Sequence, residues 1–448
     1  ATTPATGRHI VRTSDGTVHA VYTVDSNPDL TITGSYRSMN VFYTNKSATG
    51  SWSTPISLSN VLLSKNELLN YAYQPSMSFD ATSSDIVVAW NRSGEIQLVR
   101  LAASTWALGT RKIASDSTVT AWSSSAPDIV VESQNTWHLV AAATKSAVPQ
   151  IIYYKTTDGG STWAAAAQQV SQNSGTTAVA NPSIALSGTV PHAVWIQGGN
   201  SVLYSYLSGA SWTVPISVNT STGVTMEGAT LIVDSAGDIH FVWNEQSTND
   251  RRVYYRKLSA GSWAANPHLM ANVSEPTGIP QVGIDTSTNI YSVFSGYSTN
   301  DIYYKKWNKP PSRWGHNVNI STNTNLGTTL GTNNLAFNGS IDRDVATTGT
   351  TSGVHFLWTQ GNPSAVVGIS GSTTPWTLVY TTVATLDAPG VQLSSLSPAS
   401  LSNQIALSAT ITVPFNRAMS HSETEDAILI TPISGNLTTI NRDFRQFT

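Results

Sequence analysis

One five-residue pattern recurs seven times along the chain, and this repeat constrains the fold more than any other feature. At their second position the copies are spaced 48 to 68 residues apart. This period fits one four-stranded sheet, which can bury its two faces only against neighbouring sheets. The repeat therefore predicts an all-β chain closed into a seven-bladed β-propeller over residues 1–386. The copies are 18–22, 86–90, 137–141, 191–195, 239–243, 290–294 and 354–358.

The strands around each copy carry shared signals of their own. A preceding strand often opens with proline, and a tight turn such as Asp15-Gly16 joins it to the repeated strand. A third strand ends in tyrosine, and a tryptophan then opens a fourth strand. The seventh unit shows no clear fourth strand, and we expect residues 1–6 to supply it. The tryptophans are Trp52, Trp106, Trp163, Trp212, Trp263 and Trp314.

Five of the nine histidines occupy the same position of the repeat. One interpretation is a ring of metal ligands or general bases. The other is structural, with each imidazole packed between blades and hydrogen-bonded to a neighbouring backbone group. We favour the structural interpretation, because a residue repeated in every blade lies far from its equivalents around the ring. The histidines are His19, His138, His192, His240 and His355.

The composition narrows the class of protein. Hydrophobic residues make up 40% and charged residues only 11%, with a net charge of −3. These values predict a large core under a surface of Ser, Thr and Asn, as in extracellular and cell-surface β-proteins, and they argue against nucleic-acid binding. The chain has no cysteine, so disulfides and thiolate sites are excluded. We expect no cofactor and no membrane span, and among metals only Ca²⁺ is left open.

The segment from Thr156 to Trp163 resembles the Asp-box, (Ser/Thr)-x-Asp-x-Gly-x-Thr-Trp, of sialidase-like (BNR-type) propellers at every defined position. The resemblance implies a structural turn in which the aspartate caps turn amides, the second glycine adopts a positive φ, and the tryptophan plugs the blade. The residues of this box are Thr156, Asp158, Gly160, Thr162 and Trp163.

The same resemblance sets out what an active sialidase needs. The family clamps a substrate carboxylate with three arginines and uses a tyrosine nucleophile with a glutamate and an aspartate acid/base. Arg8 lies in the expected first strand, but Gly7-Arg8-His9-Ile10 lacks the proline of the family motif. The remaining arginines would be Arg251, Arg252 or Arg343. Sialidases have six blades whereas seven repeats are counted here, so we lean against enzymatic activity and assign no catalytic residue.

Polar residues on the first strand of each blade are the best candidates for ligand binding, because these strands line the central channel of a propeller. Asp342 and Asp344 share one face of a strand and Arg343 points to the other. Paired carboxylates would hold Ca²⁺ or perform acid/base chemistry, although such groups more often pair with arginines or with water. The candidates are Arg8, Asp128, Glu132, Gln281, Asp342, Arg343 and Asp344.

The repeat stops near residue 386, and a Pro/Gly-containing linker follows. Residues 387–448 resemble the bacterial Ig-like β-sandwich of surface-layer proteins and adhesins. This module is usually longer, so the last residue, Thr448, would leave an incomplete sheet with unpaired edges. We expect the natural chain to continue, or another chain to complete the sheet.

Two functions of different classes follow. The first is a non-catalytic extracellular surface protein, with the propeller displayed on an Ig-like stalk for adhesion to glycans or proteins, or for assembly with its own copies into a filament or layer. The alternative is a secreted glycoside hydrolase of sialidase-like type, or a polysaccharide lyase, that acts at the channel mouth. The sequence identifies no ligand for either.

Overall fold

The computed structural model describes the parts of the chain that form the sheets. By its contacts the chain divides into a unit of residues 1–383 and a unit of residues 384–448, and all described residues belong to the first. The predicted Ig-like segment 387–448 and the predicted closing strand 1–6 therefore lie outside them. The described ranges are 7–25, 39–59, 72–92, 95–110, 112–114, 119–122, 126–163, 167–247, 250–271, 276–285, 289–296, 301–308, 313–315, 317–321, 335–341, 354–361 and 377–383.

The first three blades are antiparallel sheets built in chain order. Blade one consists of β1 (Ile10–Arg12), β2 (Val18–Asp25), β3 (Met39–Lys46) and β4 (Ile56–Ser57). Blade two consists of β5 (Ala72–Phe79), β6 (Ile86–Arg92), β7 (Glu95–Ala102), β8 (Ala107–Leu108) and β9 (Lys112–Ala114). Blade three consists of β10 (Val119–Trp122), β11 (Asp128–Val131), β12 (Trp137–Lys145), β13 (Val148–Thr156) and β14 (Gln168–Gln169).

The next three blades repeat this order, and a smaller sheet follows them. Blade four consists of β15 (Val179–Ser187), β16 (Val190–Gln197), β17 (Ser201–Ser208), β18 (Ser211–Trp212) and β19 (Ile216–Ser217). Blade five consists of β20 (Ala229–Val233), β21 (Ile239–Ser247), β22 (Asp250–Ser259), β23 (Ser262–Trp263) and β24 (His268–Ala271). Blade six consists of β25 (Pro276–Ile284), β26 (Ile290–Gly296), β27 (Ile302–Asn308), β28 (Arg313–Trp314) and β29 (Val318–Asn319). The last sheet consists of β30 (Leu335–Ile341), β31 (Val354–Gly361) and β32 (Thr377–Val383).

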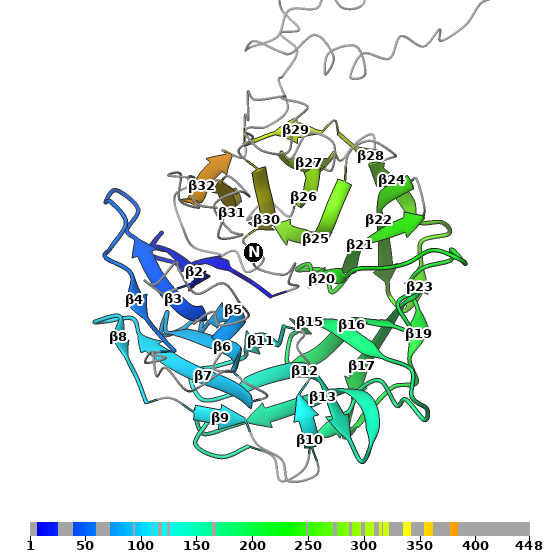
Figure 1. Cartoon of the computed structure of the whole chain (residues 1–448), viewed down its shortest axis with the longest axis horizontal. Coiled ribbons are helices and arrows are strands. Elements are labelled where there is room, and N and C mark those ends of the chain that lie inside the picture. Colours follow the sequence, from blue (N-terminus) through cyan, green and yellow to red (C-terminus); the bar gives the residue numbers. More distant parts are fainter. Residues whose placement is uncertain are drawn as a thin grey trace, which may run out of the picture. The chain divides into compact units, whose positions relative to one another are not determined.

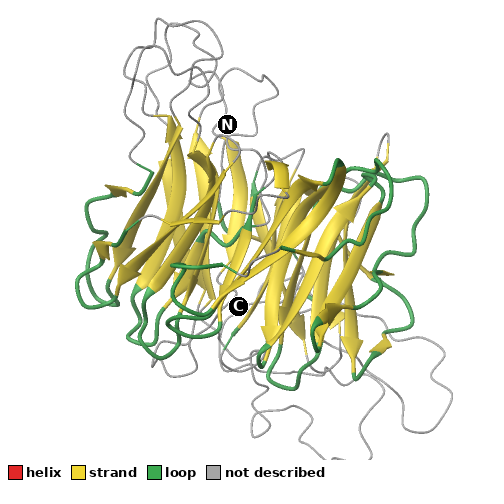
Figure 2. Cartoon of the chain, turned by 90° about the horizontal axis from the view of Figure 1, so that it is seen from below, coloured by secondary structure: helices red, strands yellow, loops and turns green. Residues whose placement is uncertain are grey.

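These sheets form a closed ring around a central axis (Figure 1). Each inner strand contacts the blade before it, and β1 contacts both β30 and β31, so the first and last sheets are neighbours. Seen from the side, the strands run between the two faces of the ring (Figure 2). The β-propeller predicted from the repeat is confirmed. The described residues contain no helix, and hence none that is long and apolar enough to cross a membrane.

The prediction of seven blades was wrong, because the structure has six complete blades. Six sheets have the four or five strands of a complete blade, whereas the described residues of the last repeat form a sheet of three strands. The sequence anticipates the difference, because no tryptophan-opened fourth strand follows Tyr380. In the complete blades the outermost strand is short and irregular. In blade four, for example, both β18 and β19 pair with β17.

Hydrophobic side chains are buried between adjacent blades, as the repeat requires. One cluster joins Val21 and Tyr43 of blade one to Met77 and Trp90 of blade two. The period-two alternation along each strand sends neighbouring residues to opposite faces, so each blade contributes to two such clusters. Burial of these side chains stabilises the packing of neighbouring blades, at about 25 cal/mol per Å² of apolar surface removed from water.

The recurrent histidines are structural, as predicted, but their partner differs from the prediction. Each Nδ1 lies 2.7 or 2.8 Å from the hydroxyl of a tyrosine on the third strand of the same blade, rather than near a backbone group. Histidine and tyrosine are diagonal neighbours on one face of the sheet, where side chains of this length meet. The pairs are His19–Tyr43, His138–Tyr153, His192–Tyr204, His240–Tyr255 and His355–Tyr380.

The turn after β13 has the local geometry expected for its sequence. Asp158 Oδ1 accepts from the amide of Thr162 at 2.8 Å and Oδ2 accepts from its hydroxyl at 2.6 Å. These hydrogen bonds lower the pKa of Asp158 to about 2. Gly160 has a φ of +81°, a conformation in which glycine carries no steric penalty. Trp163 packs edge-on against Tyr154, so its indole helps to close the blade.

Candidate functional site

A buried arginine–aspartate pair crosses the channel. Arg8 and Asp128 are both fully buried, with Arg8 Nη1 at 3.9 Å from Asp128 Oδ1. The guanidinium also donates to the main-chain oxygens of Ile129 and, at 2.6 Å, of Ile184. Because Arg8 precedes β1 in blade one and its partners belong to blades three and four, its side chain spans the channel. The pair therefore acts as a crosslink at the centre of the ring.

Asp128 belongs to a ring of polar residues that lie at one level of the inner strands. Each is opposite the fourth residue of the recurring pattern, as shown by strand register or, for His9, by its main-chain hydrogen bond to Val21. Side chains in this ring also bond to one another, as from Ser76 Oγ to Asp128 Oδ1 at 2.6 Å. The ring therefore satisfies buried polar groups. Its members are His9, Ser76, Asp128, Ser183, Thr230, Gln281 and Ser340.

The structure brings three of the predicted ligand-binding residues together, in an inaccessible place. Arg8 and Asp128 form the crosslink. Gln281 donates through Nε2 to Gly7 O at 3.1 Å and accepts through Oε1 from Ser340 Oγ at 3.0 Å. Glu132 lies elsewhere, at the end of β11, where it bonds His138 Nε2 at 2.8 Å. Asp342, Arg343 and Asp344 lie outside the described residues.

The inner strands bend just before the polar ring, at the mouth of the channel. Register shifts interrupt the pairing between Tyr73 and Ser76 and between Ala180 and Ser183. Gln74 and Asn181 occupy these bulges with φ values of +54° and +50°. Left-handed backbone at a non-glycine residue is costly and concentrates at functional sites, and bulges re-aim side chains. This end of the channel is therefore the place to look for a binding site.

The carboxylate of Glu227, which precedes β20 in blade five, lies at this mouth and is held by hydrogen bonds. Glu227 Oε2 accepts from Asn244 Nδ2 at 2.9 Å. With the Gln246 amide oriented so that its nitrogen faces the carboxylate, it donates to Glu227 Oε1 at 3.1 Å and accepts from Arg251 Nη2 at 3.1 Å. The main-chain oxygen of Glu227 accepts from Asn181 Nδ2 at 2.6 Å, which joins blades four and five.

The surroundings of Glu227 combine exposure with rigidity. Glu227 and Gln246 are partly exposed, whereas Asn244 is buried. The amide oxygen of Asn244 accepts from the main-chain N–H groups of Glu227 and Gly228 at 3.2 and 3.1 Å. Glu227 is thus partly exposed while two amides fix the orientation of its carboxylate, as hydrogen bonding to an incoming ligand requires.

An aromatic pair lies on the other face of the same strands. Trp243 and Tyr254 stack with ring centroids 5.7 Å apart, and the Tyr254 hydroxyl accepts from Arg252 Nη1 at 3.4 Å. The side chains of Arg251 and Arg252 therefore lie on opposite faces of β22. Among the described residues, no group of three or more His, Asp or Glu side chains is placed to hold a metal ion.

Sequence reasoning missed Gln74, Asn181 and Glu227. A signal for two of them was present, since Gln74 and Asn181 both precede the proline that opens an inner strand. Such residues normally adopt extended backbone, so their positive φ values could not be inferred. Glu227 stands alone before β20 and belongs to no motif.

Similarity to known proteins is found among solved structures. The sequence matches no protein-family model and no curated protein. Among solved structures, the Hadza microbial sialidase aligns with a TM-score of 0.47 at 13% identity over 66% of this chain, and the chain spans only 63% of that sialidase. The NanB sialidase of Streptococcus pneumoniae gives 0.45 at 10% identity, over 66% of each chain. An ulvan lyase bound to its saccharide gives 0.49 at 9% identity, over 84% of this chain and 94% of that one.

At such identities and TM-scores, no activity named for these proteins is transferred to this chain. The Asp-box and Ig-like assignments remain predictions, since no family match supports either.

Proposed function

We propose that the protein is an extracellular carbohydrate-binding propeller that takes a glycan at the channel mouth. The supporting observation is the Glu227 carboxylate, which is partly exposed and held by the amides of Asn244 and Gln246. A carboxylate accepts hydrogen bonds from sugar hydroxyls, and neighbouring amide and guanidinium groups donate to them. The low charge and the Ser, Thr and Asn content of the chain fit an extracellular location.

The test is glycan binding by the wild type and by Glu227→Gln. A glycan array identifies the ligand, and calorimetry then measures its affinity. Glu227→Gln removes charge-assisted hydrogen bonds worth about 1.5–3 kcal/mol, so we expect affinity to fall at least tenfold. The control is Glu95→Gln, because Glu95 is an exposed glutamate at the start of β7 in blade two, away from blades four and five. Absence of glycan binding, or equal effects of the two variants, would contradict the proposal.

The same carboxylate supports a second candidate, a glycoside hydrolase or polysaccharide lyase. A solvent-accessible carboxylate with a fixed orientation meets the geometric requirement for a general base. Incubation of bound glycans with the wild type separates the candidates. Release of shortened or unsaturated products, abolished by Glu227→Gln, would establish the enzyme, and unchanged glycan with intact binding would establish the binding protein.

A further inference from the structure

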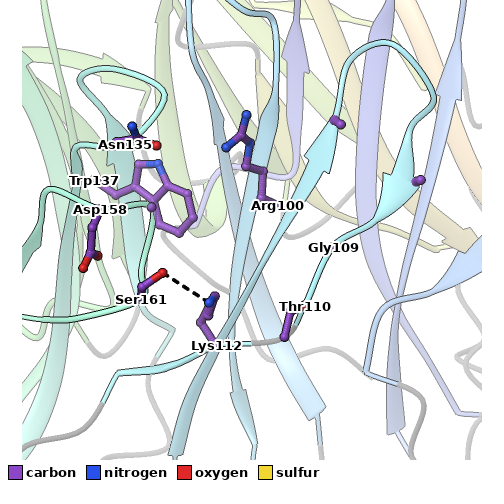
Figure 3. Close-up of a pocket in the computed structure, with 11 residues that line it drawn as sticks. Arg100, Gly109, Thr110, Lys112, Asn135, Trp137, Asp158 and Ser161 are labelled. Carbon is purple, nitrogen blue, oxygen red and sulfur yellow. Dashed lines mark hydrogen bonds between the residues drawn. The ribbon is translucent and has the colours of Figure 1, made fainter.

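A pocket lies between blades two and three (Figure 3). Its volume is about 360 Å³, within the range of small-ligand sites. The outer strands of blade two form one wall, and the turns that follow β11 and β13 form the other. The lining residues are Arg100, Ala102, Ala107, Gly109, Thr110, Lys112, Asn135, Trp137, Asp158, Gly159 and Ser161.

Two parts of the pocket, the Trp137 side chain and the glycine turn after β13, do not recur in the other blades. Trp137 opens the recurring pattern of blade three, where most other copies carry an aliphatic residue such as Val18 or Ile239. Its indole lies beneath the glycine turn, since a Cβ at Gly160 would stand 2.8 Å from Trp137 Cζ3. Only blade three has this Asp-Gly-Gly turn. A feature unique to one blade is not required to build the ring, and so it is available for specificity.

Hydrogen-bond donors dominate the polar lining. Arg100 donates through Nε to Asp85 Oδ2 at 2.8 Å and through Nη2 to the same oxygen, which fixes the guanidinium and leaves Nη1 available. Lys112 Nζ donates to Ser161 Oγ at 3.4 Å, and no described carboxylate forms an ion pair with it. Asn135 adds a further amide.

The one carboxylate of the lining is already engaged. Asp158 accepts from Thr156 Oγ1 at 2.8 Å and from Thr162. In Figure 3 its oxygens point away from Lys112. Among the described residues, no carboxylate therefore neutralises the Lys112 ammonium, which lies in the pocket lining with the ion-paired guanidinium of Arg100.

We propose that this pocket binds the anionic group of an acidic sugar, either the carboxylate of a uronic acid or a sulfate ester. The guanidinium and ammonium donate to the anionic oxygens, and the amide of Asn135 and the hydroxyls of Thr110 and Ser161 bond ring hydroxyls. This site is separate from the channel mouth and does not depend on the function proposed for Glu227.

The test is titration of the intact protein with three probes: glucuronic acid, glucose 6-sulfate and glucose. We expect one or both anionic sugars to bind, glucose to bind at least tenfold more weakly, and binding to weaken with salt. Lys112→Ala should reduce affinity for the anion at least tenfold, and Ser161→Ala should reduce it less. The control is Lys257→Ala, which removes a lysine of β22 in blade five that is ion-paired with Asp238.

The outcomes are distinct. Preference for glucuronic acid assigns a uronic acid, and preference for glucose 6-sulfate assigns a sulfate ester. The proposal is overturned if neither anion binds, if glucose binds equally well, or if Lys257→Ala has the same effect as Lys112→Ala. Loss of anion binding in Glu227→Gln but not in Lys112→Ala would place the acidic sugar at the channel mouth instead. Melting curves confirm that each variant is folded.

Discussion

Replacement of Asp128 by alanine should destabilise the propeller more than removal of an ordinary core residue. The carboxylate pairs with Arg8 and accepts from Ser76 Oγ at 2.6 Å, Ser183 Oγ at 3.1 Å and the amide N–H of Ile184 at 2.9 Å. Breaking a buried ion pair costs about 3–5 kcal/mol, because one charge remains uncompensated. The unpaired N–H of Ile184 adds about 1–3 kcal/mol. The sum is a large share of the 5–15 kcal/mol typical of a folded domain.

Urea unfolding followed by tryptophan fluorescence measures this loss, since the chain has 14 tryptophans. We expect Asp128→Ala to lower the midpoint strongly with little change in the slope. In the double variant Arg8→Met/Asp128→Ala both charges are gone, so the cost should be well below the sum of the single costs. A loss below about 1 kcal/mol for Asp128→Ala, or strict additivity of the two changes, would refute the crosslink.

Two further predictions concern the blades. Burial lowers the pKa of His19 from 6.5 to about 3 and that of His355 from 6.5 to about 4. Between these values the unfolded chain binds more protons than the folded chain. The contribution of these histidines to stability is therefore complete above about pH 6.5 and is lost as the pH falls toward 4. Circular dichroism during acid titration checks this, and equal stability at pH 7 and pH 4 would contradict it. Gly160→Ala should cost about 1–3 kcal/mol, because of its positive φ and the contact with Trp137, whereas Gly209→Ala, at φ +63° with open space around it, should cost less. Melting temperatures of the two variants decide the matter.

The propeller architecture could be predicted because the sequence pattern recurs once in each blade. The spacing of histidine, tyrosine and tryptophan located the strands, since each blade must present the same groups to its neighbours. The partner of the histidines was harder to infer. His138 and Tyr153 lie on different strands, and their meeting depends on a register that places Lys155, not Tyr153, directly opposite His138.

The functional residues were less accessible to sequence reasoning. Arg8, Asp128 and Gln281 lie on or next to inner strands, but their burial was not foreseen. Arg8 is buried because its side chain reaches across the channel to blades three and four. The Glu227 carboxylate is oriented by Asn244 and Gln246 on the adjacent strand, and this contact is set by strand pairing. The pocket beside Lys112 lies between two blades. Its walls come from residues 100–112 and 135–161, and only the packing of the blades brings them together.

Residues that recur should support the ring, and residues that do not recur should bind ligand. Calorimetric titration of the array-identified glycan into wild type, Glu227→Gln and Tyr43→Phe, with a melting curve for each, tests this division most directly. We predict that Glu227→Gln loses at least tenfold in affinity and stays folded, while Tyr43→Phe loses about 1 kcal/mol of stability and keeps its affinity. Unchanged affinity in Glu227→Gln, or reduced affinity in folded Tyr43→Phe, would contradict it.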